Sequence, residues 1–145
     1  MKIAFFSETY HPTINGVVIS MDLYKTALEQ LGHEVHIFCP GRKGYFDAIG
    51  SRVYRLPALP IPGHPEYPIA SPWYPTIAPF LHGLGIDLVH CHHLFGIATI
   101  GLRAAQKLHL PTLLTYHTLL EGYTHYLGPF SRLAKRLVIS RSKWF

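Results

Sequence analysis

Short apolar runs alternate with segments of helical periodicity along most of this chain of 145 residues. Unbroken apolar runs of about four to eight residues are typical of strands buried on both faces of a parallel sheet. Apolar residues spaced i, i+3, i+4 between such runs predict helices that cover the sheet. The alternation therefore predicts an α/β fold, a Rossmann-like parallel sheet with helices on both faces.

The expected elements follow directly from this alternation. Strands are expected at residues 3–6, 35–39, 53–56, 86–91 and 112–116. Helices are expected at residues 17–31, from Pro72 or Pro75 to Leu84, at residues 96–108, and from Phe130 onward. If the strands follow the order 3-2-1-4-5, the first, fourth and fifth lie side by side, and their carboxyl ends form a ligand crevice.

Prolines are concentrated in one segment of the chain. Eight of the 12 prolines lie between Pro57 and Pro79. Proline removes a backbone donor and restricts the residue before it. We therefore expect residues 57–72 to form a long extended loop on the surface of a single domain that spans residues 1–145.

Composition excludes several classes of protein. The net charge is +5, and the whole excess comes from residues 122–145, which contain no acidic residue. A neutral body with one basic end argues against a nucleic-acid-coating protein. The longest apolar run, residues 94–102, is too short to span a bilayer. Two cysteines without a CxxC pair predict free buried thiols in a reducing cytosol.

The first strand-to-helix turn contains Asn15, Gly16 and Val17. It lacks the GxGxxG pattern of dinucleotide-binding dehydrogenases, and the second strand ends in Cys39-Pro40 rather than in an acid. Asn15-Gly16 at a helix start favours anion binding by free backbone amides. A plain turn with Gly16 at positive φ explains the same residues equally well.

Histidines follow the fourth and fifth strands. His90 and His92 share one strand face, His93 follows them, and His117 ends the neighbouring strand. A zinc site is one interpretation, although the ligand spacing is not typical of one. Histidines packed at the strand end and bonded to the backbone are the simpler interpretation for His90 and His93. At its position His117 is expected to face a substrate, with Glu121 either orienting its imidazole or capping the loop.

Three stretches together resemble a known family: KIAFFSETYHPTINGVV, IDLVHCHHLFGIATIGLRAAQKLHLPTLLTYHT and EGYTHYLG. They are similar to retaining GT-B glycosyltransferases of family 4, especially bacterial enzymes that glucosylate diacylglycerol. The resemblance covers essentially the whole chain. It implies transfer of a sugar, usually glucose from UDP-glucose or another nucleotide sugar, to a lipid acceptor, with no tightly bound cofactor or metal.

The resemblance also implies roles for individual residues. His117 is the implied catalytic residue, in contact with the transferred sugar. Asn15, Gly16 and Val17 are expected near the donor diphosphate. The implied acceptor-side residues are Tyr10, His11, Glu121, Tyr123 and His125, with the proline-rich segment at the entrance.

Family members are more than twice as long, and their second domain supplies a Glu-x7-Glu pair that this sequence lacks. We therefore expect residues 1–145 to be a nearly complete N-terminal, acceptor-side domain without its donor-binding partner, and with negligible transferase activity alone. The alternative is a non-enzymatic nucleotide- or partner-binding domain from a truncated reading frame.

The basic end of the chain has its own interpretation. The helix expected from Phe130 has an apolar stripe, and most of its cations lie elsewhere: Arg132, Lys135, Arg136 and Lys143. A basic amphipathic helix is typical of membrane-surface elements, although a core-packed helix with a solvated face has the same pattern. Since family members with lipid acceptors are peripheral membrane proteins, we expect a cytoplasmic protein at the inner face of an anionic membrane.

Overall fold

A parallel sheet of five strands forms the centre of the molecule in the computed structural model, which describes residues 1–61, 64–71, 74–117, 136 and 139–140. The strand order is β3-β2-β1-β6-β7, and every neighbouring pair is parallel. This order confirms the one predicted from the sequence. The strands are β1 (Lys2–Phe6), β2 (Glu34–Pro40), β3 (Val53–Leu56), β6 (Leu88–Cys91) and β7 (Thr112–Leu114).

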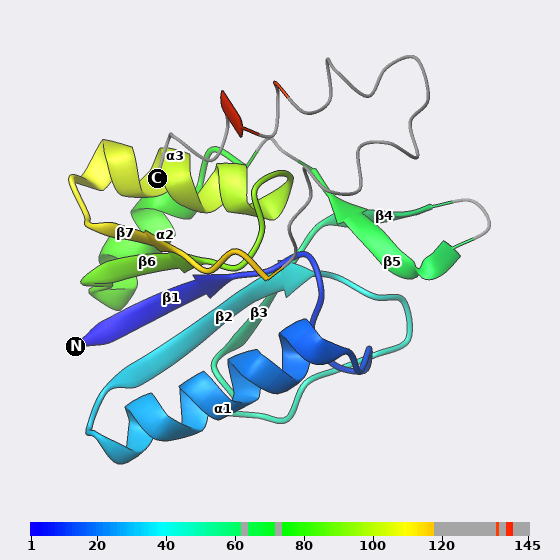
Figure 1. Cartoon of the computed structure of the whole chain (residues 1–145), viewed down its shortest axis with the longest axis horizontal. Coiled ribbons are helices and arrows are strands. Elements are labelled where there is room, and N and C mark those ends of the chain that lie inside the picture. The colour runs from blue at the N-terminus through cyan, green and yellow to red at the C-terminus, as the bar shows by residue number, and fades with distance from the viewer. Residues whose placement is uncertain (62–63, 72–73, 118–135, 137–138, 141–145) are drawn as a thin grey trace.

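Helices cover both faces of the sheet, as predicted. Helix α1 (Gly16–Gln30) lies on one face, and α2 (Ile77–Leu84) and α3 (Ile97–Leu108) lie on the other (Figure 1). The chain steps from β1 to β2 in one direction and from β6 to β7 in the other. Because crossovers keep one hand, opposite steps place their helices on opposite faces. The reversal of direction falls between β1 and β6.

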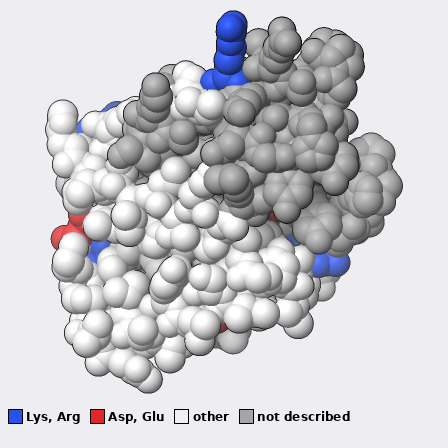
Figure 2. Space-filling view, viewed as in Figure 1, with Lys and Arg blue, Asp and Glu red and all other residues white. Residues whose placement is uncertain are grey.

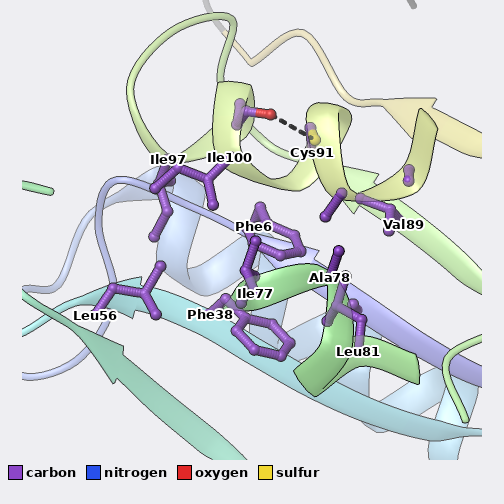
Figure 3. Close-up of a cluster of buried hydrophobic side chains, with 14 of the residues drawn as sticks. Phe6, Phe38, Leu56, Ile77, Ala78, Leu81, Val89, Cys91, Ile97 and Ile100 are labelled. Carbon is purple, nitrogen blue, oxygen red and sulfur yellow. Dashed lines mark hydrogen bonds between the residues drawn. The ribbon is translucent and has the colours of Figure 1, made fainter. Parts of the chain in front are cut away.

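Alternate residues of the strands enter two separate cores. On the α2–α3 side, Phe6 and Phe38 stack with ring centroids 4.7 Å apart, and Cys91 and Ile97 pack nearby (Figure 3). On the α1 side, residues such as Phe5 pack against the helix. Burial on both faces explains why these strands are continuously apolar rather than alternating.

The prediction of an extended loop at residues 57–72 is wrong. Instead, the proline-rich segment forms an antiparallel ribbon of β4 (Ala58–Ile61) and β5 (His64–Ala70). In a ribbon of two strands each strand is an edge strand, so half of its N–H groups need no partner. Proline is tolerated at such positions, which is why this composition did not prevent strand pairing. The ribbon projects from the body of the domain beside the carboxyl ends of the sheet (Figure 1).

Both cysteines are buried free thiols, as the sequence predicted. The Cys91 thiol donates a weak hydrogen bond to the carbonyl of Ala98 at 3.6 Å (Figure 3). None of the helices in the described residues has the length and apolar character that crossing a membrane requires.

Candidate functional site

Polar side chains converge at the carboxyl ends of β1 and β6, where the direction of the crossovers reverses. In open α/β sheets this reversal leaves a crevice that binds ligands. Glu8 follows β1, His92 and His93 follow β6, and His117 lies three residues beyond β7. The amino end of α1 closes the other side of the crevice with Asn15.

Glu8 connects three segments around this crevice. Its carboxylate accepts hydrogen bonds from the backbone N–H of Ile97, at the start of α3, and from that of Ala70, at the end of β5. Burial raises the pKa of Glu8, and the two backbone hydrogen bonds partly oppose this rise. A negative group at the first residue of α3 also interacts favourably with the helix dipole.

His93 is fixed in a defined tautomer by the end of β1. The backbone N–H of Glu8 lies 3.2 Å from its Nδ1, and the Ser7 hydroxyl lies 3.4 Å from the same atom. A backbone N–H can only donate, so Nδ1 accepts and the proton of the neutral ring sits on Nε2. Burial lowers the pKa of His93 to about 4, which keeps the ring neutral at physiological pH. The prediction that His93 bonds to the backbone is confirmed.

Three histidines form a row beside β6 and β7. His90 Nε2 lies 2.7 Å from the Thr115 hydroxyl, and the rings of His90 and His92 stack with centroids 4.2 Å apart. His92 Nδ1 in turn lies 2.9 Å from His117 Nε2. Within the described part of the chain, no three His, Cys, Asp or Glu side chains are placed to hold a metal ion.

An apolar pocket of about 450 Å³ opens next to these polar groups. It lies between the start of α1, the end of β5 and the loop that joins β6 to α3. Its apolar walls include the half-exposed Ile69 and Phe95. The polar residues at its edge are Glu8, Thr9, Asn15 and His93. Such a combination suits a ligand with an apolar body and a polar head.

The start of α1 borders this crevice, and its expected place near a donor diphosphate stays a prediction. Asn15 caps the helix, because its side-chain oxygen accepts from the Val18 N–H at 3.0 Å and its amide donates to Thr9 at 3.2 Å. Asn15 and Val17 both line the apolar pocket. Gly16 is the first residue of α1 and does not have positive φ, so the alternative of a turn with Gly16 at positive φ is wrong.

Tyr10 and His11 lie on the α1 side of the crevice and are both anchored by one carboxylate. The Tyr10 hydroxyl donates to Asp22 at 2.9 Å, and His11 Nε2 lies 2.7 Å from the other oxygen of the same group. Tyr10 is buried in the α1-side core, and burial together with the bond to Asp22 raises its pKa. Its role toward an acceptor stays a prediction.

Several predicted site residues lie outside the described residues. They are the acceptor-side Glu121, Tyr123 and His125 and the basic Arg132, Lys135 and Lys143. Arg136 is described, and it is helical and exposed.

A larger hollow, of about 770 Å³, runs along the edge strand β3 beneath Phe46 and Phe80. It contains none of the histidines at the strand ends, so we place the site at the smaller pocket. Sequence reasoning missed Ile69 and Phe95 as individual site residues and gave Glu8 no role of its own. An acidic residue directly after a buried first strand was a signal for Glu8, whereas Ile69 became visible only once the ribbon was known.

The fold is that of a doubly wound, Rossmann-like domain, and its crevice lies at the topological switch point, where such domains bind ligands. The chain belongs to glycosyltransferase family 4, whose model matches residues 14–145.

The names of curated relatives are consistent with membership in this family. An alpha-monoglucosyldiacylglycerol synthase of Acholeplasma laidlawii is 35% identical over 145 residues, which cover 99% of this chain and 35% of the relative. One of Streptococcus pneumoniae (strain ATCC BAA-255 / R6) is 30% identical over 128 residues, 88% of this chain and 29% of the relative. A GDP-mannose-dependent alpha-mannosyltransferase of Corynebacterium glutamicum is 26% identical over 137 residues, 90% of this chain and 33% of the relative. This chain therefore spans about a third of the length of these relatives.

Proposed function

We propose that this domain is the acceptor side of a retaining glycosyltransferase that transfers glucose from UDP-glucose, or another sugar from its nucleotide, to a lipid such as diacylglycerol. The observation that carries the proposal is the apolar pocket beside the polar strand ends. A diacylglycerol has the same division, with an apolar body and one hydroxyl group that accepts the sugar. The two synthases named above supply the choice of this acceptor.

The lipid body would lie against Ile69 and Phe95, at the apolar walls of the pocket. This orientation brings its hydroxyl toward the polar edge formed by Glu8 and His93. Burial of the apolar part stabilises the complex by roughly 25 cal/mol for each Å² removed from water. The acceptor would thereby be held with its reacting oxygen toward the carboxyl ends of the strands.

The donor would approach from the amino end of α1. The free backbone amides after Asn15 and the positive end of the helix dipole suit the diphosphate of a nucleotide sugar. Gly16 has open space around its Cα, so a phosphate can come close to the backbone. His117, on the opposite side of the crevice, would donate a hydrogen bond to a hydroxyl of the transferred sugar. It would so hold the sugar in place while positive charge develops on the sugar ring and negative charge on the departing diphosphate.

A second, donor-binding domain and a membrane surface complete the proposal. We assign recognition of the nucleobase to a separate donor-binding domain, because this chain spans only about a third of the length of its relatives. We assign membrane attachment to the basic segment that includes Arg132, Lys135, Arg136 and Lys143, at the cytoplasmic face. Two further features favour contact with a membrane. Figure 2 shows few charged side chains on the described part of one face of the molecule, and Ile19 and Leu23 of α1 are more than half exposed.

The test is a transfer assay on the natural polypeptide that carries this domain, with labelled UDP-glucose or GDP-mannose and diacylglycerol in phosphatidylglycerol vesicles. We expect a glycolipid whose anomeric configuration matches that of the donor. His117→Ala should lower kcat by about a hundredfold, because it removes a hydrogen bond to the transferred sugar in the transition state. His82→Ala changes an exposed residue of α2 and is the matched control.

Three results would contradict the proposal. The first is an absence of transfer from either donor despite tight nucleotide binding, which favours a binding module. The second is a product of inverted configuration, which contradicts retention. The third is equal activity of the His117→Ala and His82→Ala variants, which removes His117 from the reaction.

A further inference from the structure

His92 and His117 meet edge to edge. Their ring planes are 20° apart and their centroids are separated by 5.2 Å, while His92 Nδ1 lies 2.9 Å from His117 Nε2. This centroid separation is close to the largest that the nitrogen–nitrogen distance permits, namely that distance plus one ring radius at each end. The two nitrogens therefore lie almost on the line between the rings, which is the geometry of a well-aligned N–H···N hydrogen bond.

The other nitrogen of His92 decides which ring donates. His92 is only 1% exposed, and no described residue offers its Nε2 a hydrogen-bond partner. A hydrogen on Nε2 would therefore be a buried donor without an acceptor, an arrangement that folded proteins rarely contain. With the hydrogen on Nδ1 instead, His92 donates to His117, and only an acceptor lone pair is left unpaired.

The protonation of His117 follows from that of His92. Because Nε2 of His117 accepts, the hydrogen of its neutral ring must be on Nδ1, at the part of the ring turned away from His92. We propose that His92 is a positioning residue that holds His117 in the Nδ1–H tautomer and so presents a neutral N–H donor to an oxygen of the bound sugar. The part of this inference that concerns the sugar rests on the proposed function.

The surroundings of His92 suit this task. Phe5 packs on its ring with centroids 4.7 Å apart, and His90 stacks on it at 4.2 Å. His90 is itself fixed by its bond to Thr115, so the His92 ring cannot easily turn. Burial and the neighbouring histidines lower the pKa of His92 to about 2, and burial lowers that of His117. Both rings are therefore neutral at pH 7, and neither is an imidazolium donor.

The direct test is the nitrogen-15 NMR spectrum of the imidazoles in the 145-residue protein at pH 7.5, which distinguishes an N–H from a bare nitrogen. We expect His117 to have its hydrogen on Nδ1. In His92→Leu the donor to Nε2 is lost, so His117 should shift to the Nε2–H form that a solvated imidazole prefers. His90→Leu is the matched control, because it removes a ring of equal size from the same face without a bond to His117. There the Nδ1–H form should persist.

The kinetics of the transfer reaction provide a second, independent test of the positioning role. In the transfer assay, His92→Leu should lower kcat about tenfold, as expected for one misdirected hydrogen bond, with KM changed less than twofold. A His117 ring in the Nε2–H form in the unmodified protein would overturn the inference, whether or not His92→Leu folds. An unchanged tautomer in a folded His92→Leu variant would also overturn it. If the tautomer shifts as expected but no sugar is transferred by the unmodified protein, the proposed function fails and the positioning role stands.

Discussion

The carboxylate of Glu8 accepts a hydrogen bond from the backbone N–H of Ile97, and so the end of β1 is joined to the start of α3. The same carboxylate fills the space into which a side chain at position 96 would project. Gly96 also combines φ of 58° with ψ of −118°, a positive-φ conformation that favours glycine. The loop after β6, which carries His92 and His93, is therefore held from both ends.

Gly96→Ala should destabilise the domain by about 3 kcal/mol. Roughly 1 kcal/mol comes from a side chain at positive φ, and the rest from displacement of the buried Glu8 carboxylate from its donors. Gly85→Ala is the control, because Gly85 has φ of 68° but open space around it, and it should cost only about 1 kcal/mol. Urea unfolding measures both changes. If both variants lose the same free energy of unfolding, the Glu8 contact does not contribute to stability.

Stability should fall as the pH drops from about 6.5 toward 4. Burial lowers the pKa of His90 to about 4, that of His92 to about 2 and that of His93 to about 4, while the unfolded chain binds protons near pH 6.5. The unfolded state therefore takes up more protons in this window, and each histidine removes about 2 kcal/mol at pH 5. Glu8, whose pKa is raised by burial, acts in the opposite direction just above pH 4.5.

This pH dependence is measured by urea unfolding at pH 7.5 and pH 5. In His90→Leu, the loss of unfolding free energy between pH 7.5 and pH 5 should be smaller by the contribution of one histidine, about 2 kcal/mol. His82→Leu, which changes an exposed histidine, should leave it unchanged. A pH difference that is the same in all three proteins would mean that His90 is not buried as a neutral ring.

Membrane binding should depend on the basic segment at the end of the chain. Replacing Arg132, Lys135, Arg136 and Lys143 with Gln should weaken binding to phosphatidylglycerol vesicles by about 1 kcal/mol for each cation. A matched variant replaces four other cations, Lys25, Arg52, Arg103 and Lys107, and should bind as the unmodified protein does. Sedimentation at low salt measures this, and equal binding to neutral and anionic vesicles would contradict an electrostatic attachment.

The fold was readable from the sequence wherever a strand is buried on both faces. Phe5 and Phe6 point to opposite cores, so β1 is apolar without interruption and cannot be mistaken for a half-exposed strand. The ribbon of β4 and β5 could not be predicted, since Pro60 and Pro68 argue against strands. Two edge strands leave room for such prolines, and this depends on pairing over a distance that no local pattern reveals.

The site was only partly readable from the sequence. The order of the strands predicted a crevice at the carboxyl ends of β1, β6 and β7, because the carboxyl ends of parallel strands share an edge. Glu8, His93 and His117 follow these three strand ends. The apolar half of the pocket depends on Ile69, which reaches the crevice only through the ribbon. The bond between His92 and His117 depends on side-chain orientation, which strand periodicity does not specify.

The most direct test of the site is an NMR titration of the 145-residue protein with a short-chain diacylglycerol, followed by UDP-glucose. We expect diacylglycerol to shift the signals of Val17, Ile69 and Phe95 around the apolar pocket. UDP-glucose, held weakly through its diphosphate and sugar without the donor-binding domain, should then shift those of Gly16 and His117. Shifts confined to Phe46, Tyr54 and Phe80 along β3, or no shift at saturating lipid, would contradict the placement of the acceptor in the crevice.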